Sequence, residues 1–506
     1  MAQTKTHRWS QQQNNIFNWF SGGTGHLIVR ARAGTGKTTT IIEGIKHAPE
    51  TKILLAAFNK RIATELDQRL ENTNAEAKTL HAIGFSFVRR YWERIFIEKR
   101  PGARKFDLAE KVCGSRVPDA IIKLVANLHT KAREIAPHAT KQGQLTEIMY
   151  QFDLLPDEDW VDEGYGVDFV EGKALEAMEL AASKKPTATG IDFSDMIFLP
   201  VRNKWLSKKF ELVVVDEAQD MTSAQLEIAQ GVCSGRVCVV GDDRQAIYGF
   251  RGADSDSLDR LKAELNATEL GLNTTYRCGT EIVKEAATLV PDFQAGPNNP
   301  EGKIISIPSD KLTDTAEYGD FILSRLNAPL VGIALSLLAQ GKRTCIAGRD
   351  IGAGLKKLIR TLAKGHAANS IPKLLERISV WEEKQVNRIL RAHRGKPVIF
   401  FASISQTGAQ IDAIRDQAQC LNSLCIEAKS VDAVTKRIDA LFTDNGLGQQ
   451  GTITCSSVHK SKGLEADRVF ILRKTLRTNS QEENNIQYVA ITRAKSTLIW
   501  VEESEV

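Results

Sequence analysis

Short apolar runs alternate with helix-like stretches at both ends of the chain. Near the amino terminus, an apolar segment at 26–29 is followed by a glycine-rich loop at 31–38, a helix-like run at 38–48 and a second apolar segment at 52–58. Strand, loop, helix and strand in this order are typical of a parallel α/β unit. The pattern therefore predicts a parallel sheet with a ligand-binding loop after its first strand.

The middle of the chain changes to helical periodicity and then returns to strands. Amphipathic stretches such as 120–134 and 172–184 predict a helical insertion. Two apolar runs follow at 210–220 and 235–245, and each ends in carboxylates. Because open parallel sheets bind ligands at the carboxyl ends of their strands, we expect one sheet that is interrupted and then resumed.

A second α/β cycle is predicted after about residue 266. It includes apolar runs within 342–350, 451–465, 467–472 and 495–503, while 366–430 mixes helical pattern with one strand-like segment at 397–403. The predicted organisation is a first α/β domain at 1–90 and 190–265 with a helical insertion at 91–189, then a second α/β domain at 266–365 and 431–506 with a shorter insertion at 366–430.

Length, composition and charge narrow the class of protein. The chain has 506 residues, 42% hydrophobic and 25% charged, which excludes a small peptide module and a broadly disordered protein. A net charge of +5 permits a nucleic-acid partner without requiring one. The eight cysteines form no CxxC pair, and no apolar run approaches the ~20 residues of a membrane helix. We therefore expect an intracellular protein without a membrane partner, in the cytoplasm or nucleoid, or in the nucleus of a eukaryote.

The loop at 31–38 fits the phosphate-binding pattern GxxxxGK[ST], with Ala31 in place of the first glycine. Gly34 and Gly36 allow backbone N–H groups to surround a phosphate, and Lys37 can reach the β- and γ-phosphate oxygens. The Thr38 hydroxyl is suited to Mg²⁺. The loop therefore predicts nucleotide binding.

The run Val213–Asp220 predicts the second half of an ATPase site. An apolar strand delivers Asp216 to a metal, and the adjacent Glu217 can polarise the attacking water. ATP and Mg²⁺ are therefore the predicted substrate and metal.

With these motifs in place, the chain resembles superfamily 1 DNA helicases of the UvrD/PcrA/Rep type, and the segments 56–60 and 79–85 are most similar to the F-box DNA helicase branch. The resemblance covers nearly the whole length. It implies two RecA-like motor domains, each with a mainly helical insertion, and the second insertion must be reduced because 278–449 also has to build part of a sheet.

The resemblance also implies roles around the nucleotide. Gln245 senses the γ-phosphate, Tyr276 stacks on adenine, Glu465 contacts the ribose, and Arg277 and Arg493 act as arginine fingers. A Q-motif role for Gln13 competes with that of an ordinary glutamine in a polar run. The predicted nucleotide-binding residues are Gln13, Ala33, Gly34, Thr35, Gly36, Lys37, Thr38, Thr39, Tyr276, Arg277, Glu465 and Arg493, and the predicted catalytic residues are Lys37, Asp216, Glu217, Gln245, Arg277 and Arg493.

A second group of residues is expected to contact DNA by the same resemblance. Aromatic rings can stack on bases for ~1–3 kcal/mol per base without reading sequence. Core packing is the alternative for Tyr248 and Phe250, and the segment Ile191–Met196 resembles the point where the chain re-enters the first motor domain. The predicted DNA contacts are Phe58, Asn59, Thr79, His81, Tyr248, Phe250 and His459.

The predicted function is an ATP- and Mg²⁺-dependent DNA helicase that acts on single-stranded DNA and its junctions with duplex. By resemblance it moves 3′→5′. Two alternatives stay open, namely a translocase that strips proteins from single strands or needs a partner to unwind, and a nucleotide-gated adaptor. Basic residues between Lys384 and Lys396 fit either phosphate contacts or a solvated helix face, and no site is assigned to them.

Overall fold

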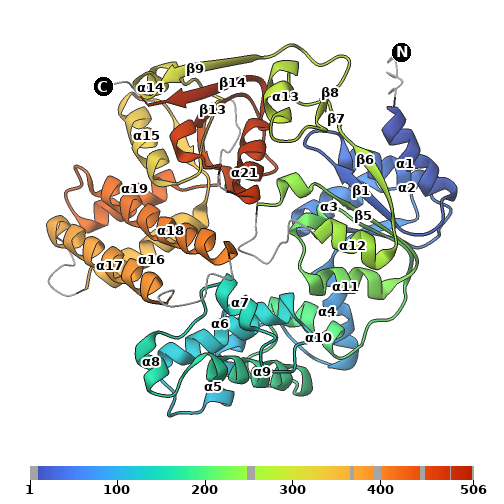
Figure 1. Cartoon of the computed structure of the whole chain (residues 1–506), viewed down its shortest axis with the longest axis horizontal. Helices are drawn as coiled ribbons and strands as arrows, with labels where there is room; N and C mark the ends of the chain where they lie inside the picture. The colour runs from blue at the N-terminus through green and yellow to red at the C-terminus, as the bar shows by residue number, and fades with distance from the viewer. Residues whose placement is uncertain are drawn as a thin grey trace. The chain divides into compact units, whose positions relative to one another are not determined.

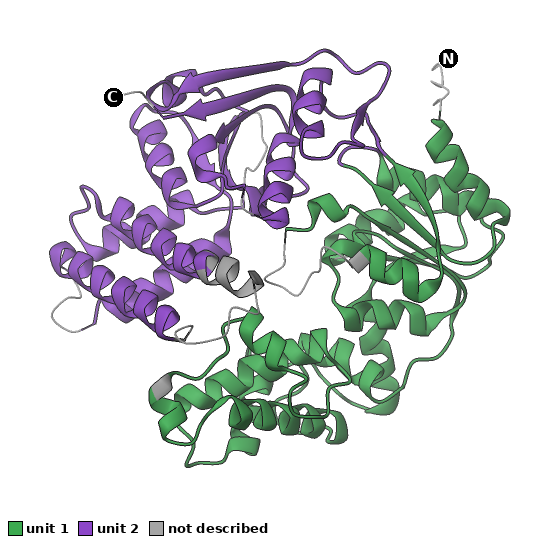
Figure 2. Cartoon of the chain, viewed as in Figure 1, with its two compact units in different colours: residues 1–32, 36–272 green, residues 33–35, 273–506 purple. Residues whose placement is uncertain are grey.

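A computed structural model of the chain describes residues 9–57, 59–247, 257–364, 370–392, 401–444, 451–478 and 480–503. Two compact units are present (Figure 2). The first contains residues 1–32 and 36–272, and the second contains 33–35 and 273–506. Each unit is built around one parallel sheet (Figure 1).

The first unit contains a six-stranded parallel sheet in the order β3-β2-β4-β5-β1-β6. Two of its central strands, β4 and β5, follow the helical insertion in sequence, so the prediction of an interrupted and resumed sheet is confirmed. Strand β6 follows residue 265 and pairs with β1 at the sheet edge. The strands are β1 Leu27–Ala31, β2 Ile53–Ala57, β3 Ala75–Thr79, β4 Phe210–Val215, β5 Cys233–Gly241 and β6 Thr268–Leu272.

Helices cover both faces of this sheet. Val213 and Val215 of β4 belong to one apolar core, and Leu212 and Val214 belong to the core on the opposite face. A strand buried on both sides has to be continuously apolar, which explains its run of valines. The surrounding helices are α1 Gln11–Gly22, α2 Lys37–His47, α3 Lys60–Arg69, α4 Leu80–Tyr91, α10 Phe193–Arg202, α11 Ser223–Val232 and α12 Ser257–Leu265.

The helices of the predicted first insertion share one apolar core with α4 and α10. Val125 and Leu128 of one helix pack with Ala174 and Met178 of another, and the same cluster continues to Phe198 of α10. These helices therefore pack against α10, one of the helices that cover the first sheet. Its helices are α5 Ala103–Cys113, α6 Asp119–Ile135, α7 Thr146–Gln151, α8 Glu158–Asp162 and α9 Val167–Ser183.

A buried ionic cluster also joins this insertion to α10. Arg133 of α6 forms ion pairs with Asp192 at 2.7 Å and with Asp195 at 2.6 Å, and Arg104 of α5 contacts Asp195 at 3.0 Å. Burial raises the pKa of Asp195, and the neighbouring carboxylate of Asp192 adds to the rise. The two guanidinium groups are therefore needed to keep two buried carboxylates together.

The second unit contains another six-stranded parallel sheet, in the order β11-β12-β10-β13-β14-β9. Both sheets are parallel, so the predicted α/β fold class is confirmed. The strands are β7 Thr274–Thr275, β8 Gln294–Ala295, β9 Lys303–Pro308, β10 Phe321–Ser324, β11 Thr344–Ile346, β12 Ile453–Ser457, β13 Ala466–Leu472 and β14 Ala494–Glu502, with β7 and β8 forming a separate pair.

The helices of the second unit include the long pair α17 and α18. The strand-like pattern at 397–403 was misleading, since the part that the structure describes, from Phe401 onward, is helical. A short apolar run cannot by itself distinguish a strand from a buried helix segment. The helices are α13 Thr280–Ala287, α14 Leu312–Thr315, α15 Ala328–Ala339, α16 Arg349–Leu362, α17 Ile371–Ala392, α18 Phe401–Cys425, α19 Val431–Leu441, α20 Val458–Ser461 and α21 Gln481–Ile491.

The α17–α18 pair shares one apolar core with the second sheet. Ile378 of α17 and Leu421 of α18 belong to the same cluster as Ile322 of β10 and Phe470 of β13. In addition, the Asp416 carboxylate of α18 accepts the backbone N–H groups of Asn327 and Ala328 at 2.7–3.0 Å, at the start of α15. Within the described ranges, no helix combines the length and apolarity needed to cross a membrane.

Candidate nucleotide and nucleic-acid site

The glycine-rich loop follows β1 and ends where α2 begins at Lys37. Gly34 and Gly36 have φ angles of +69° and +79°, in the left-handed region that side chains disfavour. The two glycines are thus needed for the turn that directs the loop into the helix. The backbone shape is that of a phosphate-binding loop, whose N–H groups and following helix amino terminus favour an anion.

Four predicted side chains lie together at the start of α2 and the end of β4. The Lys37 ammonium is 2.9 Å from Glu217 Oε1, and the Thr38 hydroxyl donates to Asp216 Oδ2 at 3.2 Å. The structure therefore brings together the loop and the acidic strand end that the sequence separates by nearly 180 positions.

Burial changes the pKa values of these side chains. Desolvation alone lowers the Lys37 pKa, but the carboxylates of Glu217, Asp242 and Asp216 outweigh it, and the net pKa is raised. Burial also raises the pKa of Asp216 to about 6, with a further contribution from Glu217. The lysine is therefore held as a cation, while the adjacent carboxylates repel each other and favour additional positive charge between them.

Gln219 organises the same site, although the sequence analysis gave it no role. Its side chain is fully buried, its Nε2 donates to Glu217 at 2.5 Å, and its Oε1 accepts the Asp242 N–H at 3.0 Å. Gln245 Nε2 in turn donates to Asp242 Oδ2 at 2.5 Å. Gln219 thus links Glu217 to the segment that carries Gln245. Its place two residues after Glu217 is the only sequence signal.

Gln13 lies beside the loop with both ends of its amide engaged. Its Oε1 accepts the Ser10 N–H as part of the cap of α1, and its Nε2 donates to the Thr40 hydroxyl at 3.0 Å. The Thr39 hydroxyl, one residue earlier on α2, accepts from Arg69 at 3.5 Å. Gln13 fits either prediction made for it, because one of its bonds belongs to the cap of α1 and the other reaches α2 beside the glycine-rich loop.

The predicted residues of the second unit form another cluster. Arg277 Nε is 2.7 Å from Glu465, whose other oxygen is 2.8 Å from Lys495, a residue the sequence analysis missed. Arg493 is buried and donates to the carbonyl groups of Val489 and Leu464. Burial lowers the pKa of Arg493 to about 10, and the nearby Arg277 cation contributes.

Three loop residues are grouped with this second unit. The Ala33 N–H donates to the Tyr488 hydroxyl at 3.0 Å, and the Gly34 carbonyl accepts the Tyr276 N–H at 2.9 Å. Thr35, the third of them, is buried, whereas the Tyr276 side chain is 49% exposed. An exposed ring beside a phosphate-type loop is available for stacking on a base.

The predicted DNA contacts are only partly described. Phe58, Tyr248 and Phe250 lie outside the described residues. Asn59 and Thr79 serve as caps, accepting the N–H groups of Ile62 and Ala82. Their side chains are thus already used in forming α3 and α4.

His81 and His459 have different surroundings. His459 lies half-buried in α20. The ring of His81 is 6.0 Å from that of Phe193, which is 63% exposed. Burial lowers the pKa of His81, so the imidazole is neutral at pH 7. The sequence analysis had assigned Ile191–Met196 only to chain re-entry and so missed the exposed ring of Phe193.

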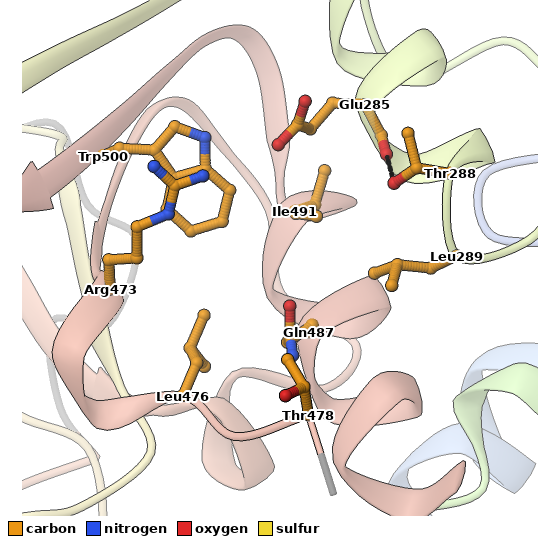
Figure 3. Close-up of a pocket in the computed structure, with 9 residues that line it drawn as sticks. All are labelled: Glu285, Thr288, Leu289, Arg473, Leu476, Thr478, Gln487, Ile491 and Trp500. Carbon is orange, nitrogen blue, oxygen red and sulfur yellow. Dashed lines mark hydrogen bonds between the residues drawn. The ribbon is translucent and has the colours of Figure 1, made fainter. Parts of the chain in front are cut away.

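A cavity of about 360 Å³ lies in the second unit (Figure 3). The Arg473 guanidinium covers the Trp500 ring at 4.6 Å on one wall, and Gln487 and Ile491 of α21 line the cavity nearby. None of the predicted nucleotide-binding or DNA-binding residues that the structure describes lines it. The cavity is therefore not part of the candidate site.

Comparisons with known proteins agree with this geometry. The family model for the UvrD/REP helicase N-terminal domain matches residues 9–266, and that for the UvrD-like helicase C-terminal domain matches residues 364–504. These two matches cover most of both units.

Individual relatives have low sequence identity. The F-box DNA helicase protein 1 of Schizosaccharomyces pombe is 24% identical over 94% of this chain and 55% of its own length. The ATP-dependent DNA helicase PcrA of Staphylococcus aureus is 26% identical over 53% of this chain and 38% of its own length. The chain thus spans about half or less of the length of these curated relatives.

A solved arterivirus nonstructural protein 10 (helicase) in complex with DNA has a TM-score of 0.34 and 10% identity, covering 97% of this chain and 63% of its own. At this level the match adds nothing to the family models. Since the first family model alone covers half of the sequence, including the glycine-rich loop and the acidic strand end, the chain belongs to the UvrD/REP helicase family.

Proposed function

We propose that the protein is an ATP-dependent DNA helicase that moves along single-stranded DNA and separates duplex at its junctions with single strands. The observation that carries this proposal is the grouping of Lys37, Thr38, Asp216 and Glu217 at the end of β4. These are the side chains that phosphoryl transfer requires for phosphate, metal and water.

The ion pair between Lys37 and Glu217 suggests how hydrolysis depends on bound ATP. In the structure, the ammonium lies 2.9 Å from the carboxylate that is proposed to accept the proton of the attacking water. A γ-phosphate draws Lys37 toward its own oxygens, which leaves Glu217 available to that water. The pair thus keeps the base occupied until substrate arrives.

The residues present fit Mg²⁺. The Thr38 hydroxyl and the Asp216 carboxylate are hard oxygen ligands 3.2 Å apart, and a metal bound by one or two protein oxygens plus phosphate is the usual arrangement for Mg²⁺ in NTPases. When bound there, the ion neutralises charge on the phosphates. Gln219 positions Glu217 through its hydrogen bond and so orients the base.

We assign Arg277 and Arg493 to stabilising charge on the transferring phosphoryl group. Each guanidinium is fixed by carbonyl or carboxylate oxygens of the second unit, which leaves little rotamer entropy to lose. We also assign 1–90 with 190–272 and 273–365 with 431–506 to the two motors, and 91–189 and 366–430 to their insertions; the boundary predicted at 265 moves to 272 because β6 pairs with β1 in the first sheet. Movement in the 3′→5′ direction is proposed from the family resemblance.

The decisive experiment follows strand separation and ATP hydrolysis together, using duplexes with either a 3′ or a 5′ single-stranded tail. Unwinding of the 3′-tailed duplex alone supports helicase activity and its direction. Lys37→Ala should abolish hydrolysis, and Lys436→Ala, on an exposed face of α19, is the matched control. Normal DNA-stimulated hydrolysis by Lys37→Ala would refute the site.

One observation favours a second candidate, a translocase without strand-separating activity of its own. The α17–α18 pair is packed into the apolar core of the second sheet and is tied to α15 by Asp416. An insertion held in this way has less freedom to engage a duplex. Hydrolysis stimulated by both tails without separation of either duplex would select this candidate.

A further inference from the structure

A second pair of aromatic rings joins α4 and the end of α10, at the opposite end from His81 and Phe193. Tyr91 stacks on Trp205 with ring centroids 4.8 Å apart and an interplanar angle of 11°, and Trp92 meets Trp205 edge-on at 5.4 Å. The Tyr91 side chain is 51% exposed, so much of its ring faces solvent. We call Tyr91, Trp92 and Trp205 the aromatic platform.

The two segments that carry the aromatic platform are rich in basic residues. The segments 89–94 and 204–209 contain one acidic residue, Glu93. A helix carboxyl terminus attracts cations, which accounts for basic residues in the last turn of α4 but not for those beyond the helix ends. The exposed basic residues of the two segments are Arg89, Arg90, Arg94, Lys204, Lys208 and Lys209.

Several contacts keep these segments in one place. The Lys209 ammonium is 4.2 Å from the centroid of the Phe87 ring of α4, and Lys208 donates to the Gln230 carbonyl at 3.0 Å. From the insertion, Lys185 donates to the Glu93 carbonyl. Lys209 is therefore held against α4, the helix that carries Tyr91.

The aromatic platform is separate from the candidate nucleotide site. Strand β4 begins at Phe210, immediately after Lys209, and ends beside Asp216, so the two sites are at opposite ends of the strand. His81 and Tyr91 lie ten residues apart on α4, which corresponds to about 15 Å along a helix. A ligand of the aromatic platform is thus not a ligand of the ATP site.

An exposed ring on segments rich in basic residues is suited to one class of partner. A single-stranded nucleic acid presents unpaired bases that stack on aromatic faces and phosphates that pair with lysine and arginine. Paired bases in a duplex cannot stack in this way, and an acidic protein would use the charges without the ring. We propose that the aromatic platform binds single-stranded nucleic acid and forms a second contact surface on the first unit.

This inference shares with the proposed function only the identity of the polymer, because it requires no ATP hydrolysis. Binding of fluorescent oligo(dT) to the full chain, measured by anisotropy without nucleotide, tests it. Tyr91→Ala should weaken binding about 5-fold or more. Tyr91→Phe keeps the ring and should bind like the unchanged protein. Tyr318→Ala is the matched control, because Tyr318 is also 51% exposed but lies in the second unit.

The charges are tested by salt dependence. Lys208→Glu with Lys209→Glu should reduce the slope of log affinity against log salt by about 0.7 for each lost phosphate contact. Lys436→Glu, an exposed lysine of the second unit, should leave the slope unchanged. Crosslinking of iodouracil-containing oligonucleotide should label peptides that contain Tyr91 or Trp205.

Unchanged affinity and salt slope in the platform variants, with crosslinks elsewhere, would overturn the inference. Equal weakening by Tyr91→Ala and Tyr91→Phe would also overturn it, since stacking would then not be the cause. If the platform variants bind normally while DNA still stimulates hydrolysis, the proposed function is supported and the proposed binding by the platform is refuted. If the unchanged protein binds no oligonucleotide, both fail.

Discussion

The two predicted helical insertions are joined to the rest of their units by different kinds of contact. The first packs through an apolar core that extends to Phe198 of α10 but includes no sheet strand, and the buried ionic cluster of Arg104, Arg133, Asp192 and Asp195 adds a second connection to α10. The second has no separate core among the described residues, because α17 and α18 share that of the sheet. Charged contacts are directional and hold one geometry, whereas an apolar core joins elements into one cooperative unit.

The largest expected change in the free energy of unfolding comes from removing a member of the ionic cluster. Arg133→Met removes the charge but retains much of the volume, and it leaves the buried Asp192 without its guanidinium partner and Asp195 with Arg104 alone. We expect a loss of about 3–5 kcal/mol in the free energy of unfolding, measured with urea. Combining Arg133→Met with Asp192→Asn and Asp195→Asn should recover part of that loss. An equal loss in both proteins would show that charge is not the cause.

The stability of the second predicted insertion should depend instead on the packing of the shared apolar core. Leu421→Ala in α18 removes buried methyl groups from the shared core, at an expected cost of about 2–5 kcal/mol. Because the core is shared, hydrogen exchange should increase in β10 and β13 as well as in α18. An increase confined to α17 and α18 would show that the insertion unfolds independently.

A smaller effect is expected at the tie between α18 and α15. Asp416→Ala leaves the N–H groups of Asn327 and Ala328 without their acceptor, which should cost about 1–3 kcal/mol. Asp412→Ala, one turn earlier on α18, removes the partly exposed ion pair with Arg477 and should cost less than about 1 kcal/mol. Chemical denaturation of both variants gives the comparison.

The smallest expected effect on stability near neutral pH comes from the titration of His129, which lies beside the ionic cluster. Burial, reinforced by Arg133, lowers its pKa to about 3, and its Nε2 bonds to the Lys105 carbonyl. The unfolded chain therefore binds a proton below pH 6.5 that the folded state does not, so stability falls as the pH falls toward 3. By pH 5.5 the free energy of unfolding should fall by about 1 kcal/mol, because each pH unit below the pKa of the unfolded state corresponds to about 1.4 kcal/mol. His129→Gln should remove this component, and an unchanged pH profile would contradict it.

Local signals in the sequence were enough for much of the fold and the nucleotide-binding half of the site. The valines of β4 require burial on two faces, and Gly34 and Gly36 are needed for positive φ, so strand and loop could be recognised from neighbouring residues alone. The order of these motifs also identified the family, which the family models confirmed.

Other features depend on partners distant in the chain. Gln219 bridges Glu217 and Asp242, and Asp416 caps a helix that begins 88 residues earlier. The stack of Tyr91 on Trp205 exists only because α4 packs beside α10. Sequence periodicity reports which side of an element is apolar, but it does not report which remote polar group lies opposite. The sequence by itself therefore determined the sheets, the loop and the family. The tertiary structure decided how each predicted insertion is held and which side chains meet. Those contacts join segments that are far apart in the chain, and their spacing along it carries no signal.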